Sequence, residues 1–164
     1  MSHLHTGSCL CGAVKFELEG EFKKFFLCHC SRCRKTSGTA HCANLFAPGA
    51  TLTWLSGEDR LRFYRLENTN FARTFCSVCG SNVPTDAKTR GLVVVPAGCL
   101  DTEVDITPQA HIFMDSRANW DEKLNEITCF DQLPPVGLFY KAVKRLAASN
   151  KVLSSFAKHK RIRR

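Results

Sequence analysis

Apolar and polar residues alternate in short segments over most of the chain, which is the pattern of half-buried β-strands. The clearest segment is residues 12–20, where Val14, Phe16 and Leu18 alternate with charged residues between two glycines. Further strands are predicted at residues 25–27, 39–47, 61–66, 71–75 and 91–96. Short helices are expected only at 31–37 and 121–124. The pattern therefore predicts a mainly β fold.

The pattern changes after the two prolines at positions 134 and 135. Apolar residues then recur at helical spacing, at positions 139, 143, 146, 152 and 156, with cations between them. We therefore predict two domains, a β domain over residues 1–135 and a basic helical extension over residues 136–164.

Charge is distributed as unevenly as hydrophobicity. All 15 acidic residues lie at or before Asp131, and residues 1–135 carry 14 of the 23 Lys and Arg, so this part is nearly neutral. The other nine cations lie in residues 136–164 and account for the net charge of +8. Such an extension is compatible with nucleic acid or an anionic membrane, although a charged run is more often a solvated helix face. Residues 1–135 are expected to bind neither, and nothing in the sequence indicates an oligomeric state.

Seven of the ten cysteines fall into three tight clusters. These are Cys9 and Cys11, then Cys28, Cys30 and Cys33, then Cys76 and Cys79. Thiolates bind zinc tetrahedrally; structural sites use four protein ligands, whereas reactive sites leave one position open. Two pairs and one triplet therefore predict a closed four-cysteine site and a three-cysteine site with room for a ligand.

Disulfides are the alternative explanation for so many cysteines. The N-terminus lacks the charged start and apolar run of a signal peptide, and no apolar stretch approaches membrane-spanning length. We therefore expect a cytoplasmic protein with reduced thiols, in which closely spaced cysteines indicate metal binding or catalysis. Cys42, Cys99 and Cys129 stand alone in the sequence and are expected to be small buried apolar residues.

The two cysteine pairs are the predicted structural site. Cys76 and Cys79 follow a predicted strand and precede Gly80, which permits the sharp turn of a metal-binding knuckle. Cys9 and Cys11 would supply the other two thiolates. In the alternative pairing, one of these four completes the triplet; it is less favoured, because it leaves three thiols without a metal.

The triplet lies among cations and beside one histidine. Arg32, Arg34 and Lys35 are candidate contacts for a carboxylate-bearing ligand, or else a solvated surface turn. His29 has the chemistry of a zinc ligand, but it lies between two ligand cysteines, so we expect it to have a supporting role. An open zinc–thiolate position suits a bound water or an incoming thiol. The soft sulfur ligands, and the lack of a carboxylate motif beside the triplet, favour the thiol.

Several segments resemble the glutathione-dependent formaldehyde-activating enzyme family, which also includes a centromere-associated vertebrate protein, centromere protein V. The segments are 7–14, 28–38 and 75–81, followed by weaker matches at 97–101, 111–112 and 116–120. The resemblance implies an Mss4-like fold of small antiparallel β-sheets around a structural zinc. It also implies that this zinc binds Cys9, Cys11, Cys76 and Cys79, and that a second, labile zinc binds Cys28, Cys30 and Cys33. Cys99 departs from the family pattern, and the basic extension lies outside it.

The leading hypothesis is a zinc-dependent enzyme of the carbon–sulfur lyase type. It would bind glutathione or a similar thiol at Cys28, Cys30 and Cys33 and add the thiol to formaldehyde or another small aldehyde. The expected cofactors are two zinc ions, with glutathione as co-substrate. One alternative is a non-catalytic zinc module that binds or carries a thiol. Another is an interaction protein that uses its basic tail.

Overall fold

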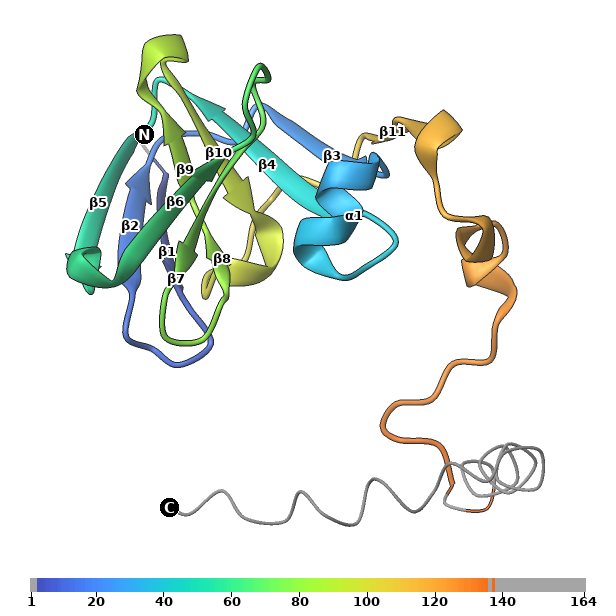
Figure 1. The fold of residues 1–164 in the computed structure, drawn as a ribbon. Helices are drawn as coiled ribbons and strands as arrows, with labels where there is room; N and C mark the ends of the chain where they lie inside the picture. Colours follow the sequence, from blue (N-terminus) through green and yellow to red (C-terminus); the bar gives the residue numbers. More distant parts are fainter. Residues whose placement is uncertain (1–2, 136, 138–164) are drawn as a thin grey trace, which may run out of the picture. The chain divides into compact units, whose positions relative to one another are not determined.

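The strands form three small sheets in the computed structural model of the chain, which describes residues 3–135 and 137 (Figure 1). The strand orders are β1-β2-β5, β11-β3-β4-β10-β9 and β6-β7-β8. The described pairs are antiparallel except that β11 runs parallel to β3. The predicted mainly β fold class is confirmed, with this parallel pair as its one departure from antiparallel sheets.

The described strands and helices follow one another closely along the chain. The strands are β1 (Leu4–Ser8), β2 (Lys15–Glu19), β3 (Lys24–Cys28), β4 (Cys42–Pro48), β5 (Thr51–Ser56), β6 (Leu61–Arg65), β7 (Ala72–Cys76), β8 (Asn82–Val83), β9 (Thr85–Ala87), β10 (Leu92–Pro96) and β11 (Ala110–Ile112). The α-helix α1 (Ser31–Ser37) and the 3-10 turns η1 (Glu58–Arg60), η2 (Lys88–Arg90) and η3 (Ala97–Cys99) lie between strands, whereas the 3-10 turns η4 (Met114–Ser116), η5 (Asn119–Asp121) and η6 (Leu124–Glu126) follow β11.

Six of these strands coincide with segments predicted from the sequence, namely β2, β3, β4, β6, β7 and β10. Strand β5 was not predicted, although its apolar residues Leu52 and Trp54 alternate with threonines. The other four escaped for physical reasons. In β1 the buried positions are His5 and Gly7, while Leu4 is exposed, so its hydrophobic pattern is out of phase with its burial. Strands β8, β9 and β11 have three residues or fewer, too few for a period of two to be recognised.

The largest core cluster lies between the first two sheets. Its buried members are Phe16, Leu18, Phe25, Leu45, Ala47, Val93, Val95 and Cys99. Trp54 of β5 packs edge-on against Phe16, with ring centroids 5.9 Å apart. Two smaller clusters consist largely of cysteine: Cys9 and Cys76 with Val14 and Val83, and Cys28 and Cys33 with Cys42. The cysteines are therefore part of the hydrophobic interior.

Contacts between residues divide the chain into two units, Met1–Glu122 and Lys123–Arg164. Of the second unit, the structure describes residues 123–135 and 137, including η6. The helix expected at 121–124 is absent, and η5 and η6 flank that position instead. The predicted helical extension over 136–164 lies outside the described residues apart from residue 137, so the domain boundary at 135 stays a prediction. No helix in the described ranges is both long and apolar enough to span a membrane.

Gly7 permits a close approach of β1 to the core. A Cβ atom at this position would overlap the Phe16 ring and the carbonyl oxygen of Cys99. We therefore expect Gly7→Ala to lower the free energy of unfolding by about 1–3 kcal/mol, the usual cost of overpacking a core. Gly98→Ala is the control, because a Cβ there meets no atom within 4 Å. Chemical denaturation measures both, and equal stability of the two variants would contradict the packing described.

Candidate metal and thiol site

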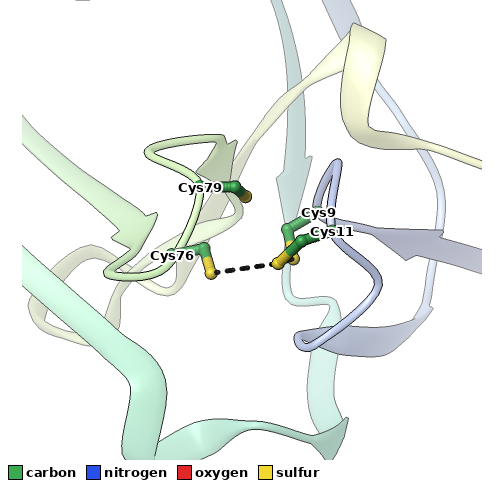
Figure 2. Close-up of side chains that lie close together, drawn as sticks. All are labelled: Cys9, Cys11, Cys76 and Cys79. Atoms are coloured by element: carbon green, nitrogen blue, oxygen red, sulfur yellow. Dashed lines mark hydrogen bonds between the residues drawn. The ribbon is translucent and has the colours of Figure 1, made fainter. Parts of the chain in front are cut away.

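Four cysteines from two loops bring their sulfur atoms together (Figure 2). Cys9 and Cys11 follow β1, whereas Cys76 and Cys79 lie at the end of β7 and just beyond it. The Sγ atoms of Cys9 and Cys11 are 3.5 Å apart, and those of Cys11 and Cys76 are 3.9 Å apart. Thiolates bound tetrahedrally to zinc at about 2.3 Å would be about 3.8 Å from one another. The sulfurs of Cys9, Cys11 and Cys76 thus approach this spacing, and all four sulfurs lie within 4.8 Å of one another, so the cluster could hold a zinc ion.

Tight backbone turns direct the sulfurs of this four-cysteine cluster toward one another. The N–H of Gly80 donates to the Cys76 carbonyl at 2.9 Å, with Gly80 in the left-handed conformation at φ 75°. On the other loop, the N–H of Gly12 donates to the Cys9 carbonyl at 2.8 Å. Each loop therefore closes as a tight knuckle, as the glycine after Cys79 led us to expect.

Although burial opposes the shift at Cys9, hydrogen bonds lower the pKa of Cys9 and of Cys79 in this cluster. The pKa of Cys11 is instead raised to about 11, because the backbone N–H of Ala13, which lowers it, is outweighed by the neighbouring thiols. The N–H of Val14 donates to Cys9 Sγ at 3.3 Å, and the N–H of Val78 donates to Cys76 Sγ at 3.4 Å. Hydrogen bonds with Ser81 lower the pKa of Cys79 to about 5. Donors aimed at a thiolate offset the loss of its hydration. Hydrogen-bonded thiolates of this kind are the form that binds zinc.

The second cluster is built where β3 passes into α1. Cys28 ends β3, Cys30 caps the helix and Cys33 lies in its first turn. Their sulfurs lie within 4.8 Å of one another, so the cluster could also hold a metal ion. The N–H of Cys33 donates to Cys30 Sγ at 3.4 Å. Although burial opposes it, this contact and the neighbouring thiols lower the pKa of Cys30.

Arg73 and Cys42 belong to this second cluster, and neither was predicted to do so. Cys42 of β4 is the cross-strand partner of Cys28. The guanidinium Nη2 of the buried Arg73 donates to Cys33 Sγ at 3.3 Å and to Cys42 Sγ at 3.6 Å. The hydrogen bond with Cys33, helped by the charge of Arg73, outweighs burial and lowers the pKa of Cys42 to about 6. The hydrogen bond with Cys42, together with burial, raises the pKa of Cys33 in turn, so Cys42 is the sulfur of this pair that favours the thiolate beside Arg73.

The three cysteines of the triplet open onto a pocket of about 620 Å³. Its size lies within the range of small-molecule sites. Its charged lining consists of Arg32, Arg65, Arg73, Arg90 and Asp86. Phe46, Phe63, Phe71 and Phe113 provide apolar walls. The pocket therefore combines sulfur, an excess of positive charge and aromatic surface.

Only one of the three predicted carboxylate contacts faces this pocket. Arg32 lines it and is exposed on α1. Neither Arg34 nor Lys35 is part of the lining; Lys35 is exposed, and Arg34 is half-buried. Sequence analysis missed Arg65, Arg73 and Arg90. Arg73 alternates with Phe71 and Phe75 on one face of the predicted strand. An arginine between two apolar residues on the same face is the sequence feature that could have identified it as a buried functional residue.

The remaining cysteines and His29 lie as follows. Cys42 and Cys99 are buried, as expected, and burial raises the pKa of Cys99 to about 12. The expectation for Cys129 was wrong: it is exposed, because its segment has no core to enter among the described residues, and its thiol donates to the Ile127 carbonyl. The ring nitrogens of His29 contact Asp121 and His111 rather than the triplet sulfurs. All ten cysteines are free thiols.

Fold and site together define a mainly β protein with two thiol clusters able to hold zinc, one of them open to a pocket. The family described as "Glutathione-dependent formaldehyde-activating enzyme" matches residues 4–116. The chain belongs to this family, which confirms the resemblance found in the sequence.

Two individual proteins are similar to the chain. A Halomonas elongata protein, provisionally named a glutathione-dependent formaldehyde-activating enzyme, is 32% identical over 127 residues, which cover 73% of this chain and 80% of that protein. A crystal structure of a Rhodobacter sphaeroides protein matches with a TM-score of 0.48 and 22% identity, over 65% of this chain and 98% of that one. We draw nothing from the second similarity, because it is too low.

Loss of one thiol from the four-cysteine cluster should unfold the β domain. Structural zinc contributes about 10–16 kcal/mol to folding in small domains, comparable with the entire stability of about 5–15 kcal/mol of a typical protein. We therefore expect Cys76→Ser to abolish the cooperative thermal transition. Cys129→Ser is the control and should melt like the wild type, because that thiol is exposed. A normal transition for Cys76→Ser would show that the cluster does not hold the fold together.

Proposed function

We propose that the chain is a zinc-dependent enzyme of the carbon–sulfur lyase type that adds glutathione, or a closely similar thiol, to formaldehyde or another small aldehyde. The observation that carries this proposal is the triplet of Cys28, Cys30 and Cys33 at the wall of a pocket. Three thiolates occupy three positions of a tetrahedral zinc and leave one for a ligand. A thiol entering from the pocket would find that position.

A zinc ion held by the triplet would supply a Lewis acid that deprotonates a bound thiol. The chain's own residues would prepare that site. Arg73 holds Cys33 and Cys42 from the side of β7, and it stacks over the Phe71 ring at 5.1 Å from the ring centroid. Because Arg73 is buried, its guanidinium keeps a fixed direction towards the sulfurs. It would balance the surplus negative charge of three thiolates around one divalent ion.

The charges of the pocket suit glutathione. This tripeptide carries two carboxylates and one ammonium group, and the pocket offers the exposed cations Arg32, Arg65 and Arg90 together with Asp86. Arginine pairs well with carboxylates because its donors form a planar fork. The phenylalanine walls would exclude water from the reacting atoms. Family membership supports the same substrate class, a small thiol and a small aldehyde.

The reaction needs no oxidant or further cofactor. The thiol loses its proton, its sulfur forms a bond with the carbonyl carbon, and the C=O π bond breaks. The carbonyl oxygen then takes up one proton, so that the product is a hydroxymethyl thioether such as S-(hydroxymethyl)glutathione. Holding the thiolate and the aldehyde in one pocket would accelerate this addition over its spontaneous rate.

Calorimetric titration of zinc-loaded protein with glutathione tests the proposal. We expect wild-type protein to bind glutathione and to accelerate its exchange with formaldehyde, measured by NMR. Cys30→Ser should lose both the heat of binding and the acceleration while it remains folded, because Cys30 is not in the four-cysteine cluster. Cys129→Ser is the control for mixed disulfides, since this exposed thiol lies outside the pocket.

Two results would count against the enzyme. Unchanged turnover in Cys30→Ser would remove the triplet from the mechanism. Glutathione binding that leaves the exchange rate at its spontaneous value would favour the alternative, a zinc module that carries a thiol without catalysis.

A further inference from the structure

A separate polar cluster lies beside the triplet and is not used by the proposed reaction. Four segments contribute to it: His29 from the turn between β3 and α1, His41 from the residue before β4, His111 from β11 and Asp121 from the end of η5. The ring centroids of His41 and His111 each lie 5.0 Å from the ring centroid of His29. Three imidazoles and one carboxylate thus meet at one point of the fold.

Contacts within this histidine cluster are short. His29 Nδ1 lies 2.5 Å from Asp121 Oδ2, and His29 Nε2 lies 2.8 Å from His111 Nδ1. His29, His41 and Asp121 each offer one ligand atom, and no two of these three atoms are more than 4.8 Å apart. Nitrogen and oxygen ligands at about 2.0–2.2 Å from one ion lie about 3–4 Å from each other. Small side-chain shifts would therefore bring all three onto one ion.

The side chains of His29 and Asp121 are buried, and one nitrogen of His41 lacks a partner. The side chains of His29 and Asp121 are only 2% and 6% exposed. His41 Nδ1 is also buried and makes no hydrogen bond to any described residue. An unpaired buried polar atom is costly, and in native proteins it often marks an ion that completes the site. A hydrogen-bonded network alone would explain His29, His111 and Asp121 but not His41.

We propose that His29, His41 and Asp121 bind one divalent transition-metal ion, distinct from any ion held by the cysteines. Two imidazoles and a carboxylate form a donor set suited to zinc, iron(II) and similar ions, and less suited to calcium or magnesium.

His111 would orient His29 towards the ion. With the metal on His29 Nδ1, the Nε2–H of His29 donates to His111 Nδ1, across the 2.8 Å contact already present. A ligating histidine commonly uses its second nitrogen in this way. His111 is exposed and gives the cluster access to solvent.

The ion would hold three separate segments together, because His41 precedes β4. Asp121 belongs to η5, whereas His29 lies in the turn that also carries Cys28 and Cys30. Successive side chains of an extended segment point in different directions, so the side chain of His29 leaves the turn on a different face from those of Cys28 and Cys30. A metal bound by His29 would therefore hold the turn from the face that the sulfurs do not occupy. The site would therefore support the triplet without taking part in thiol chemistry.

Metal content of the full-length protein tests the proposal. Protein loaded with zinc and freed of excess metal by gel filtration is analysed for zinc per chain. We expect His41→Gln and Asp121→Asn each to hold one equivalent less than the wild type. Asp121→Asn keeps the size of the side chain and its ability to accept a hydrogen bond from His29, so the fold is retained. His3→Gln changes an exposed histidine and should leave the zinc content unchanged.

Cobalt(II) loading identifies which site has lost its ion. Thiolate-bound cobalt shows intense charge-transfer absorption, whereas cobalt bound by nitrogen and oxygen does not. Both variants should keep the thiolate bands and lose the remaining weak absorption. Wild-type metal content in both variants would overturn the proposal, as would a loss confined to the thiolate bands. Neither result depends on glutathione binding or turnover, so the proposed function is tested separately.

Discussion

The meeting of four thiols between the loop after β1 and the loop after β7 is the constraint on which the rest of this protein depends. Cys11 and Cys76 are 65 positions apart in the sequence, yet their sulfurs are 3.9 Å apart. Closing so long a loop costs conformational entropy, and a metal ion shared by the two loops would offset it. The cluster joins the loop after the first strand to the third sheet, beside an apolar cluster that includes Val14 and Val83.

Strand β7 transmits this constraint to the pocket. It carries Cys76 at its end and Arg73 three residues earlier. A metal ion that holds Cys76 in place would therefore also restrict the position of Arg73. Arg73 in turn reaches Cys33 on α1 and Cys42 on β4, and Cys42 pairs across the sheet with Cys28. A buried guanidinium is unfavourable without an anion, and Cys42, whose pKa is lowered to about 6, is the thiol suited to provide it here. A continuous series of contacts thus connects the four-cysteine cluster, through β7 and Arg73, to the triplet.

Much of this arrangement could be predicted from the sequence because its signals are local. Alternation identified β2 and β7, and the spacing of the cysteines grouped them into one set of four and one of three, each of which the structure brings together. What escaped depends on contacts between distant segments. Cys42 joins the triplet only through the register of β3 with β4, and Arg73 reaches it only because β7 lies alongside. The histidine cluster likewise assembles residues from four segments, and no two of its members have a spacing typical of a ligand motif.

The central claim is that one thiol cluster is saturated by protein ligands while the other accepts a thiol from outside. Cadmium-113 NMR of the cadmium-loaded, full-length protein tests it directly, because the chemical shift reports the number of sulfur ligands at each ion. We predict one resonance from the four-cysteine cluster that glutathione leaves in place, and one from Cys28, Cys30 and Cys33 that shifts when glutathione adds a fourth sulfur. A spectrum in which glutathione moves neither resonance would contradict the claim, and so would one in which only the four-cysteine signal moves.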